Sequence, residues 1–195
     1  MKNSLKLING RKIESPKSDK TRPTTLMVRE AVFNILGESV KNSDWLDLFC
    51  GSGSLSCEAY NHGAKRVVAV EKNRQNAQLS RKNLISISDS QIRKNNFEII
   101  CKDVFSWIKS YSKGNNVSEN NLNKTPFDFI YIDPPYKCNF YEILLKNLFN
   151  SYAIKDNTLI ICEHSKKDEI IDNPIWKKND IRIYGQTQLT FLIKI

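Results

Sequence analysis

The segment Asp47-Leu48-Phe49-Cys50-Gly51-Ser52-Gly53-Ser54-Leu55 constrains the fold more than any other part of the 195-residue chain. It joins a predicted strand over 45–49 to a predicted helix over 55–62, which should end at Gly63. Glycines between a strand and a helix let the backbone turn tightly and approach a ligand closely. The segment therefore predicts a parallel α/β sheet with a ligand-binding loop at the carboxyl end of one strand.

Strand and helix patterns alternate along most of the remaining sequence. Further strands are predicted over 66–70, 97–101, 129–132 and 158–162, and further helices over 74–85, 104–111 and 141–149. The sequence then predicts two strands, 181–184 and 187–195, joined by a tight turn at Gly185-Gln186. This order favours a doubly wound, mostly parallel sheet with helices on both faces, ending in an antiparallel β-hairpin.

The first 37 residues are predicted to form a basic extension that packs on a core domain of residues 38–195. The extension should contain short strands within 5–15 and then a helix, with Thr24 or Thr25 as its N-cap and Gly37 just past its end. Residues 1–30 carry a net charge of +5, out of +9 for the whole chain. Clustered positive charge favours a polyanionic partner because phosphate contacts release counterions, although a basic surface that only aids solubility is the alternative.

Neither a membrane span nor a metal site is predicted. No stretch reaches the ~20 apolar residues that a span needs, and residues 1–10 lack the apolar core of a secretory signal. The histidines lack ligand spacing and the odd number of cysteines forms no C-x-x-C pair, so we expect buried free thiols at Cys50, Cys57, Cys101, Cys138 and Cys162. The expected protein is a soluble, cytoplasmic monomer.

Four acidic residues lie at or just past the carboxyl ends of predicted strands, and these ends meet at one edge of a parallel sheet. Asp47 would repel the pyrophosphate of a dinucleotide, and Ser56 stands where a nicotinamide enzyme would have a third glycine. An acid at position 47 instead suits the amino group and sulfonium of S-adenosylmethionine. Glu71 is placed to accept hydrogen bonds from ribose hydroxyls, and Asp103 from an adenine amino group. The alternative is a purely structural glycine turn.

The fourth acid opens the loop Asp133-Pro134-Pro135-Tyr136. Two prolines fix the backbone and remove two donors, so the loop presents carbonyl oxygens and a carboxylate. The exocyclic amine of a nucleic-acid base is a poor nucleophile because its lone pair is delocalised into the ring. Asp133 and the Pro134 carbonyl are placed to hold its two hydrogens, and Tyr136 to stack on the base. The base would have to be flipped out of its stack to reach this loop.

These motifs resemble the motif set of class I amino methyltransferases, and other segments narrow the resemblance to the RsmD family. The segments are Arg22-Pro23-Thr24-Thr25, Val28-Arg29-Glu30, Phe33-Asn34-Ile35-Leu36, Gly10-Arg11-Lys12 and Tyr184-Gly185-Gln186-Thr187. The resemblance implies a seven-stranded sheet, S-adenosylmethionine as the methyl donor, and methylation of N2 of a guanine in 16S ribosomal RNA. It also implies a substrate within an assembled or nearly assembled small ribosomal subunit.

The motifs and the resemblance together give three groups of candidate site residues. The catalytic group is Asp133, Pro134, Pro135 and Tyr136. The cofactor-binding group is Asp47, Phe49, Gly51, Ser52, Gly53, Leu55, Glu71, Lys72, Asp103 and Val104. The RNA-binding group is Arg11, Lys12, Lys17, Lys20, Arg22, Thr24 and Arg29.

The sequence departs from the family pattern at Leu26-Met27, where members often have a polar, charged pair, and in a longer loop at 112–125. Two alternative functions also stay open, the first because the same loop can serve other base amines. One is a DNA methyltransferase acting on adenine N6 or cytosine N4, although no target-recognition domain is evident. The other is a non-catalytic RNA-binding assembly factor, for which we would expect a broken Asp-Pro-Pro-Tyr loop.

Overall fold

In the computed structural model, the described residues are 4–16, 24–88, 96–112, 125–135, 140–168, 170 and 174–195. Their main sheet has seven strands in the order β5-β4-β3-β6-β7-β9-β8. The parallel strands are β3 (Asp44–Leu48), β4 (Arg66–Glu71), β5 (Phe97–Cys101), β6 (Phe129–Ile132) and β7 (Leu159–Ser165). An antiparallel hairpin of β8 (Trp176–Tyr184) and β9 (Thr187–Lys194) completes the sheet, with β9 paired to β7. The predicted fold class is confirmed.

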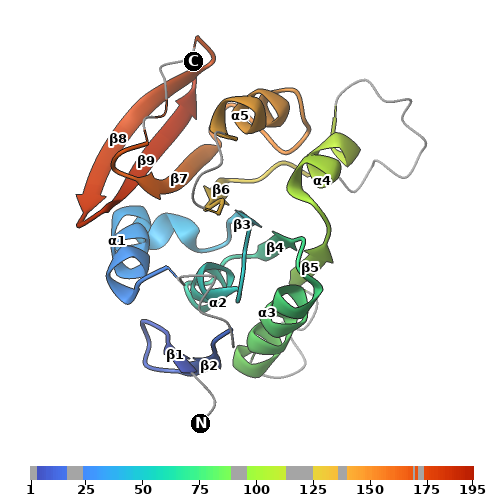
Figure 1. Cartoon of the computed structure of the whole chain (residues 1–195), viewed down its shortest axis with the longest axis vertical. Helices are drawn as coiled ribbons and strands as arrows, with labels where there is room; N and C mark the ends of the chain where they lie inside the picture. Colours follow the sequence, from blue (N-terminus) through green and yellow to red (C-terminus); the bar gives the residue numbers. More distant parts are fainter. Residues whose placement is uncertain are drawn as a thin grey trace.

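Helices cover both faces of this sheet (Figure 1). One face carries α1 (Leu26–Leu36), α2 (Ser54–Asn61) and α3 (Arg74–Ile87), and the other carries α4 (Val104–Ser110) and α5 (Tyr141–Phe149). Alternate strand residues enter the two cores: Trp45 and Tyr131 pack with α1 to α3, whereas Leu46 and Ile130 pack with α4 and α5. Because successive side chains of a strand point to opposite faces, every second residue of β3 and β6 lies on the α1 face of the sheet.

A separate two-stranded hairpin precedes α1. Its strands β1 (Ser4–Lys6) and β2 (Lys12–Glu14) pair antiparallel, and the turn between them contains Gly10 with φ +84°. Leu7 and Ile13 are 1% and 3% exposed and belong to the same apolar cluster as α1 and α2. The hairpin is therefore continuous with the core beneath that face of the sheet.

Most predicted element boundaries agree with the structure because their signals are local. The Thr25 hydroxyl accepts a hydrogen bond from the Val28 N–H at the start of α1, and Gly37 ends that helix with φ +54°. Three features differ from the prediction, and one of them is that β7 extends to Ser165 instead of ending at Cys162. The 3-10 turn η1 (Gly37–Val40) was not predicted, and β8 begins at Trp176 rather than at Ile181. The first half of β8 is polar because β8 is an edge strand, so its sequence resembles a loop.

Three of the predicted buried thiols, Cys50, Cys57 and Cys162, are free and buried, but Cys101 is exposed. Cys138 lies outside the described residues. In the part of the chain that the structure describes, none of the helices has the length and apolar character needed to cross a membrane. The same residues contain no cluster of three or more His, Cys, Asp or Glu side chains suited to a metal ion.

Candidate active site

The carboxyl ends of neighbouring parallel strands bring the predicted acids to one edge of the sheet. Asp47 of β3 is paired in register with Tyr131 of β6, and Asp133 follows two residues later on the same face. On the other side of β3, β4 ends at Glu71, and Asp103 follows the next strand, β5. The structure therefore assembles residues from four separate segments, as the sequence predicted.

The glycine loop after β3 has two glycines with different tasks. Both have left-handed backbone, with φ +54° at Gly51 and φ +76° at Gly53. A Cβ added at Gly51 would meet no atom within 4 Å, so the backbone there borders open space. A Cβ at Gly53 would lie 2.2 Å from Oγ of Ser80 on α3. Gly51 thus leaves room for a ligand, whereas Gly53 allows close packing of the loop against α3.

Phe49, which opens this loop, also has left-handed backbone at φ +68°. Such a conformation costs of order 1 kcal/mol for a residue with a side chain, and strained residues of this kind cluster at ligand sites. Ser52 is buried, and its carbonyl accepts a hydrogen bond from Asn83 Nδ2 at 2.9 Å. Asn83 also exchanges two hydrogen bonds with the backbone of Glu14, so it links the loop to β2. The loop is held in place by contacts distant in sequence.

Glu71 is oriented by the backbone around it. Its Oε2 accepts the Gly51 N–H at 3.0 Å and its Oε1 accepts the Asn73 N–H at 2.7 Å. Each carboxylate oxygen has a second lone pair, so Glu71 retains capacity to accept hydroxyl hydrogens. The carboxylate therefore ties β4 to the glycine loop and still suits the predicted contact with a ribose.

Asp47 is 2% exposed, and its Oδ2 accepts a hydrogen bond from the Ser56 hydroxyl at 2.6 Å. Burial raises the pKa of Asp47 to about 7; the hydrogen bonds from Ser56 oppose this, and the nearby carboxylates of Glu71 and Glu163 add to it. A cation next to Asp47 would favour the ionised carboxylate. The position thus suits a positively charged amino group.

The other predicted cofactor residues differ in exposure. Asp103 is exposed and caps α4, with Oδ1 accepting the Ser106 N–H at 3.0 Å. Lys72 is also exposed. Leu55 and Val104, at 4% and 2% exposure, pack in the two apolar cores. The side chain of Asp103 is therefore more accessible to a cofactor than the side chains of these two apolar residues.

The predicted catalytic loop brings Asp133 together with a residue predicted to bind RNA. The Thr24 hydroxyl lies 3.4 Å from Asp133 Oδ2, so Thr24 belongs to this site. Pro134 is buried and Pro135 is exposed, whereas Tyr136 lies outside the described residues. Burial raises the pKa of Asp133 well above its usual range, and two further carboxylates add to the rise.

Sequence reasoning missed Glu163, one of those carboxylates. It lies on β7, is 5% exposed, and its Oε2 accepts hydrogen bonds from Tyr131 at 2.5 Å and Thr24 at 3.2 Å. The signal that could have found it is an acid directly after the apolar run of residues 159–162. Acids are almost never fully buried without a partner, so such a placement indicates a specific role.

The prediction that Arg29 contacts RNA is wrong. Arg29 is 1% exposed, and its guanidinium donates to Glu58 Oε1 at 2.7 Å and to the Lys6 carbonyl at 2.8 Å. Glu58 Oε1 also accepts the Ile8 N–H at 3.0 Å. These contacts join α1, α2 and the first hairpin, so Arg29 stabilises the fold and has no surface to offer a nucleic acid.

The remaining predicted RNA contacts divide into two groups. Arg11 and Lys12 are exposed on the first hairpin, and Arg11 Nη1 also donates to the Ile87 carbonyl at the end of α3, at 2.8 Å. The others, Lys17, Lys20 and Arg22, lie outside the described residues, as do residues 113–124 of the predicted long loop. Leu26 and Met27, which follow Thr24 closely in the sequence, are 38% and 61% exposed.

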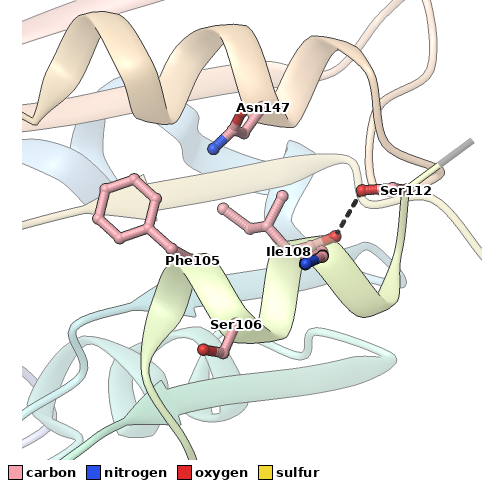
Figure 2. Close-up of a pocket in the computed structure, with 6 residues that line it drawn as sticks. Phe105, Ser106, Ile108, Ser112 and Asn147 are labelled. Atoms are coloured by element: carbon pink, nitrogen blue, oxygen red, sulfur yellow. Dashed lines mark hydrogen bonds between the residues drawn. The ribbon is translucent and has the colours of Figure 1, made fainter.

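A pocket of about 320 Å³ lies between α4 and α5 (Figure 2). Phe105 and Ile108 of α4 face Asn147 of α5 across it, and the Ser112 hydroxyl donates to the Ile108 carbonyl at one end. None of the residues predicted for the site lines this pocket. The pocket is therefore separate from the candidate site at the sheet edge.

The chain is similar to known proteins over most of its length. Residues 7–193 match the family described as Conserved hypothetical protein 95. The chain is 33% identical to Ribosomal RNA small subunit methyltransferase D of Buchnera aphidicola subsp. Acyrthosiphon pisum, over 93% of this chain and 86% of the relative.

Two solved structures share the fold. The putative methyltransferase yhhF of Escherichia coli has a TM-score of 0.81 at 23% identity, covering 98% of both chains. A putative methyltransferase complexed with SAH has a TM-score of 0.72 at 17% identity, covering all of this chain and 56% of the other. At these identities the two structures support the architecture alone.

Proposed function

This chain belongs to the RsmD family, and on that premise we propose that it is an S-adenosylmethionine-dependent methyltransferase acting on N2 of a guanine in 16S ribosomal RNA. One observation carries the proposal. The Asp133-Pro134-Pro135 loop, which suits an amine, follows β6, and the glycine loop follows β3, its hydrogen-bonded neighbour. The proposed site for the methyl-accepting amine and the proposed site for the methyl-donating cofactor thus lie at the same edge of the sheet.

The residues at the carboxyl ends of β3, β4 and β5 fit S-adenosylmethionine. Asp47 is a buried carboxylate suited to the amino group, and the open space beside Gly51 admits the ligand to the backbone. The oriented carboxylate of Glu71 suits the ribose hydroxyls, and the exposed Asp103 suits the adenine amino group. When bound, the cofactor supplies a methyl group activated by its sulfonium.

The loop after β6 would prepare the guanine amine. We propose that Asp133 and the Pro134 carbonyl accept its two hydrogens, which orients the nitrogen lone pair toward the methyl group. Holding both groups in line supplies most of the rate enhancement, because alignment replaces a bimolecular encounter. The methylated nitrogen must then lose one proton, and Asp133 is the carboxylate in position to receive it.

We propose further that the substrate is RNA within an assembling or assembled small ribosomal subunit, and that the enzyme is a cytoplasmic monomer. The net charge of +9 supports a polyanionic partner. The target guanine must leave its stack to reach Asp133. The exposed basic residues Arg11 and Lys12 remain proposed RNA contacts.

The test is methyl transfer from labelled S-adenosylmethionine to small ribosomal subunits that lack the modification. Nucleoside analysis by mass spectrometry is expected to give N2-methylguanosine at one site. Naked 16S RNA and duplex DNA serve as parallel substrates. Transfer to DNA alone would favour the adenine or cytosine alternative, and cofactor binding without any transfer would favour a non-catalytic assembly factor.

A variant links this activity to the site. Asp133→Ala is expected to abolish methyl transfer while cofactor affinity stays within a few-fold of wild type. Asp168→Ala is a matched control, because it removes an exposed carboxylate from the turn after β7. Equal loss of cofactor binding and transfer in folded Asp133→Ala would contradict the assigned role.

A further inference from the structure

Glu163 lies beside Asp133 and faces the same side of the sheet. Ile132 of β6 pairs with Cys162 of β7 in a parallel register, so the next residues along the two strands are Asp133 and Glu163. Both follow by two positions residues that face the α1 side, Tyr131 and Ile161. The two carboxylates are therefore neighbours by construction of the sheet.

One hydroxyl is shared between these carboxylates. Thr24 Oγ1 lies 3.2 Å from Glu163 Oε2 and 3.4 Å from Asp133 Oδ2. A hydroxyl has a single hydrogen to donate, so it bridges the two acids and cannot fully satisfy both. Tyr131, which is 1% exposed, donates a second hydrogen bond to Glu163 Oε2 at 2.5 Å. The Tyr131 hydroxyl thus holds Glu163 in place, whereas the hydrogen bond described for Asp133 is the one it shares through Thr24.

Within the described residues, the charged groups that act on Asp133 are carboxylates and so have one sign. The titratable groups that face it in the described part of the chain are Asp47 on β3, Tyr131 on β6, Glu163 on β7 and Tyr141 on α5. The neutral Thr24 hydroxyl reaches Asp133 from the segment just before α1. After burial, Glu163 makes the largest contribution to the raised pKa of Asp133. A carboxylate with a like charge beside it holds a proton more strongly.

We propose that Glu163 is a positioning residue that makes Asp133 a stronger proton acceptor for the substrate amine, acting through its charge and the shared Thr24 hydroxyl. This role rests on the proposed function. The guanine N2 forms a bond to the methyl carbon as the bond from that carbon to sulfur breaks, leaving a neutral thioether. One proton then moves from the cationic nitrogen to Asp133, and the N–H bonding pair stays on nitrogen.

The test compares the pH dependence of kcat for wild type and Glu163→Gln on small ribosomal subunits. Glutamine keeps the shape and an acceptor oxygen but removes the charge, so the pKa of Asp133 falls. Asp133 must be ionised to accept the proton, so the acid limb of the profile is expected to shift to lower pH. Cofactor affinity should stay within a few-fold of wild type. Glu98→Gln, which removes an exposed charge on β5, should leave the profile unchanged.

A second variant should shift the acid limb of the pH profile in the opposite direction. It also keeps the proposal testable if Glu163→Gln does not fold. The Thr24 hydrogen bond lowers the pKa of Asp133, so Thr24→Val is expected to shift the acid limb to higher pH. Unchanged acid limbs in the folded variants would overturn the role of Glu163 while wild-type transfer still supports the proposed function. Absence of wild-type transfer would instead refute the function itself.

Discussion

The buried ion pair between Arg29 and Glu58 gives a quantitative test of the fold. In Arg29→Met, an apolar side chain replaces the guanidinium, so Glu58 loses its cation and the Lys6 carbonyl loses its donor. The two charged side chains are 2% and 0% exposed, so water does not compensate. Breaking such a buried pair from one side costs about 3–5 kcal/mol. For a domain of this size each kcal/mol lowers the melting temperature by about 2–4 °C, so the expected loss is about 6–20 °C.

The assay is thermal unfolding followed by circular dichroism at neutral pH, with Lys82→Met as the matched control. Lys82 pairs with Glu14 at 2.6 Å, but that pair is 59% and 35% exposed, so its loss should cost at most about 1 kcal/mol. Adding Glu58→Gln to Arg29→Met removes the stranded charge and should recover part of the loss. If Arg29→Met melts within the range of the Lys82→Met control, the reasoning about this cluster is refuted.

Four further predictions concern the glycine loop and Asp47. Gly53→Ala should destabilise the protein by about 1–3 kcal/mol through its clash with Ser80, and adding Ser80→Gly should relieve part of that loss in thermal melts. Gly51→Ala meets no such clash and should instead raise the cofactor dissociation constant in calorimetry; unchanged affinity would count against the site. Cofactor affinity should rise from about pH 5.5 to about pH 7.5 as Asp47 ionises, and Asp47→Asn should flatten that dependence. Because the folded state retains a proton that the unfolded chain releases, Asp47→Asn should also raise the melting temperature more at about pH 8 than at about pH 5; an equal effect at both would oppose the assignment.

The sequence predicted those features whose signals are local. The bounds of β6 (Phe129–Ile132) and α5 (Tyr141–Phe149) agree with the prediction, and α1 is delimited by the predicted cap and glycine. The acids at the strand ends were found because a parallel sheet gathers them at one edge. Periodicity and capping act within a few residues, so they can be identified without knowledge of the fold.

Features that depend on distant segments could not be predicted in this way. Arg29 is one of eight basic residues among the first 30, and nothing near it in the sequence indicates that it will form an ion pair with Glu58. Thr24 looked like a helix cap or a phosphate contact, but it bonds to residues more than 100 positions away. The pairing of such groups is decided by tertiary packing, which no local pattern encodes.

The position of β9 has a consequence for how the protein is made. β9 follows every other described strand in the sequence, yet it lies inside the sheet between β7 and β8. Until β9 has been synthesised, β7 has an unpaired, apolar edge, which is a template for association with other chains. Incomplete chains on the ribosome therefore expose this edge during translation, and we expect them to depend on chaperones more than the finished protein does.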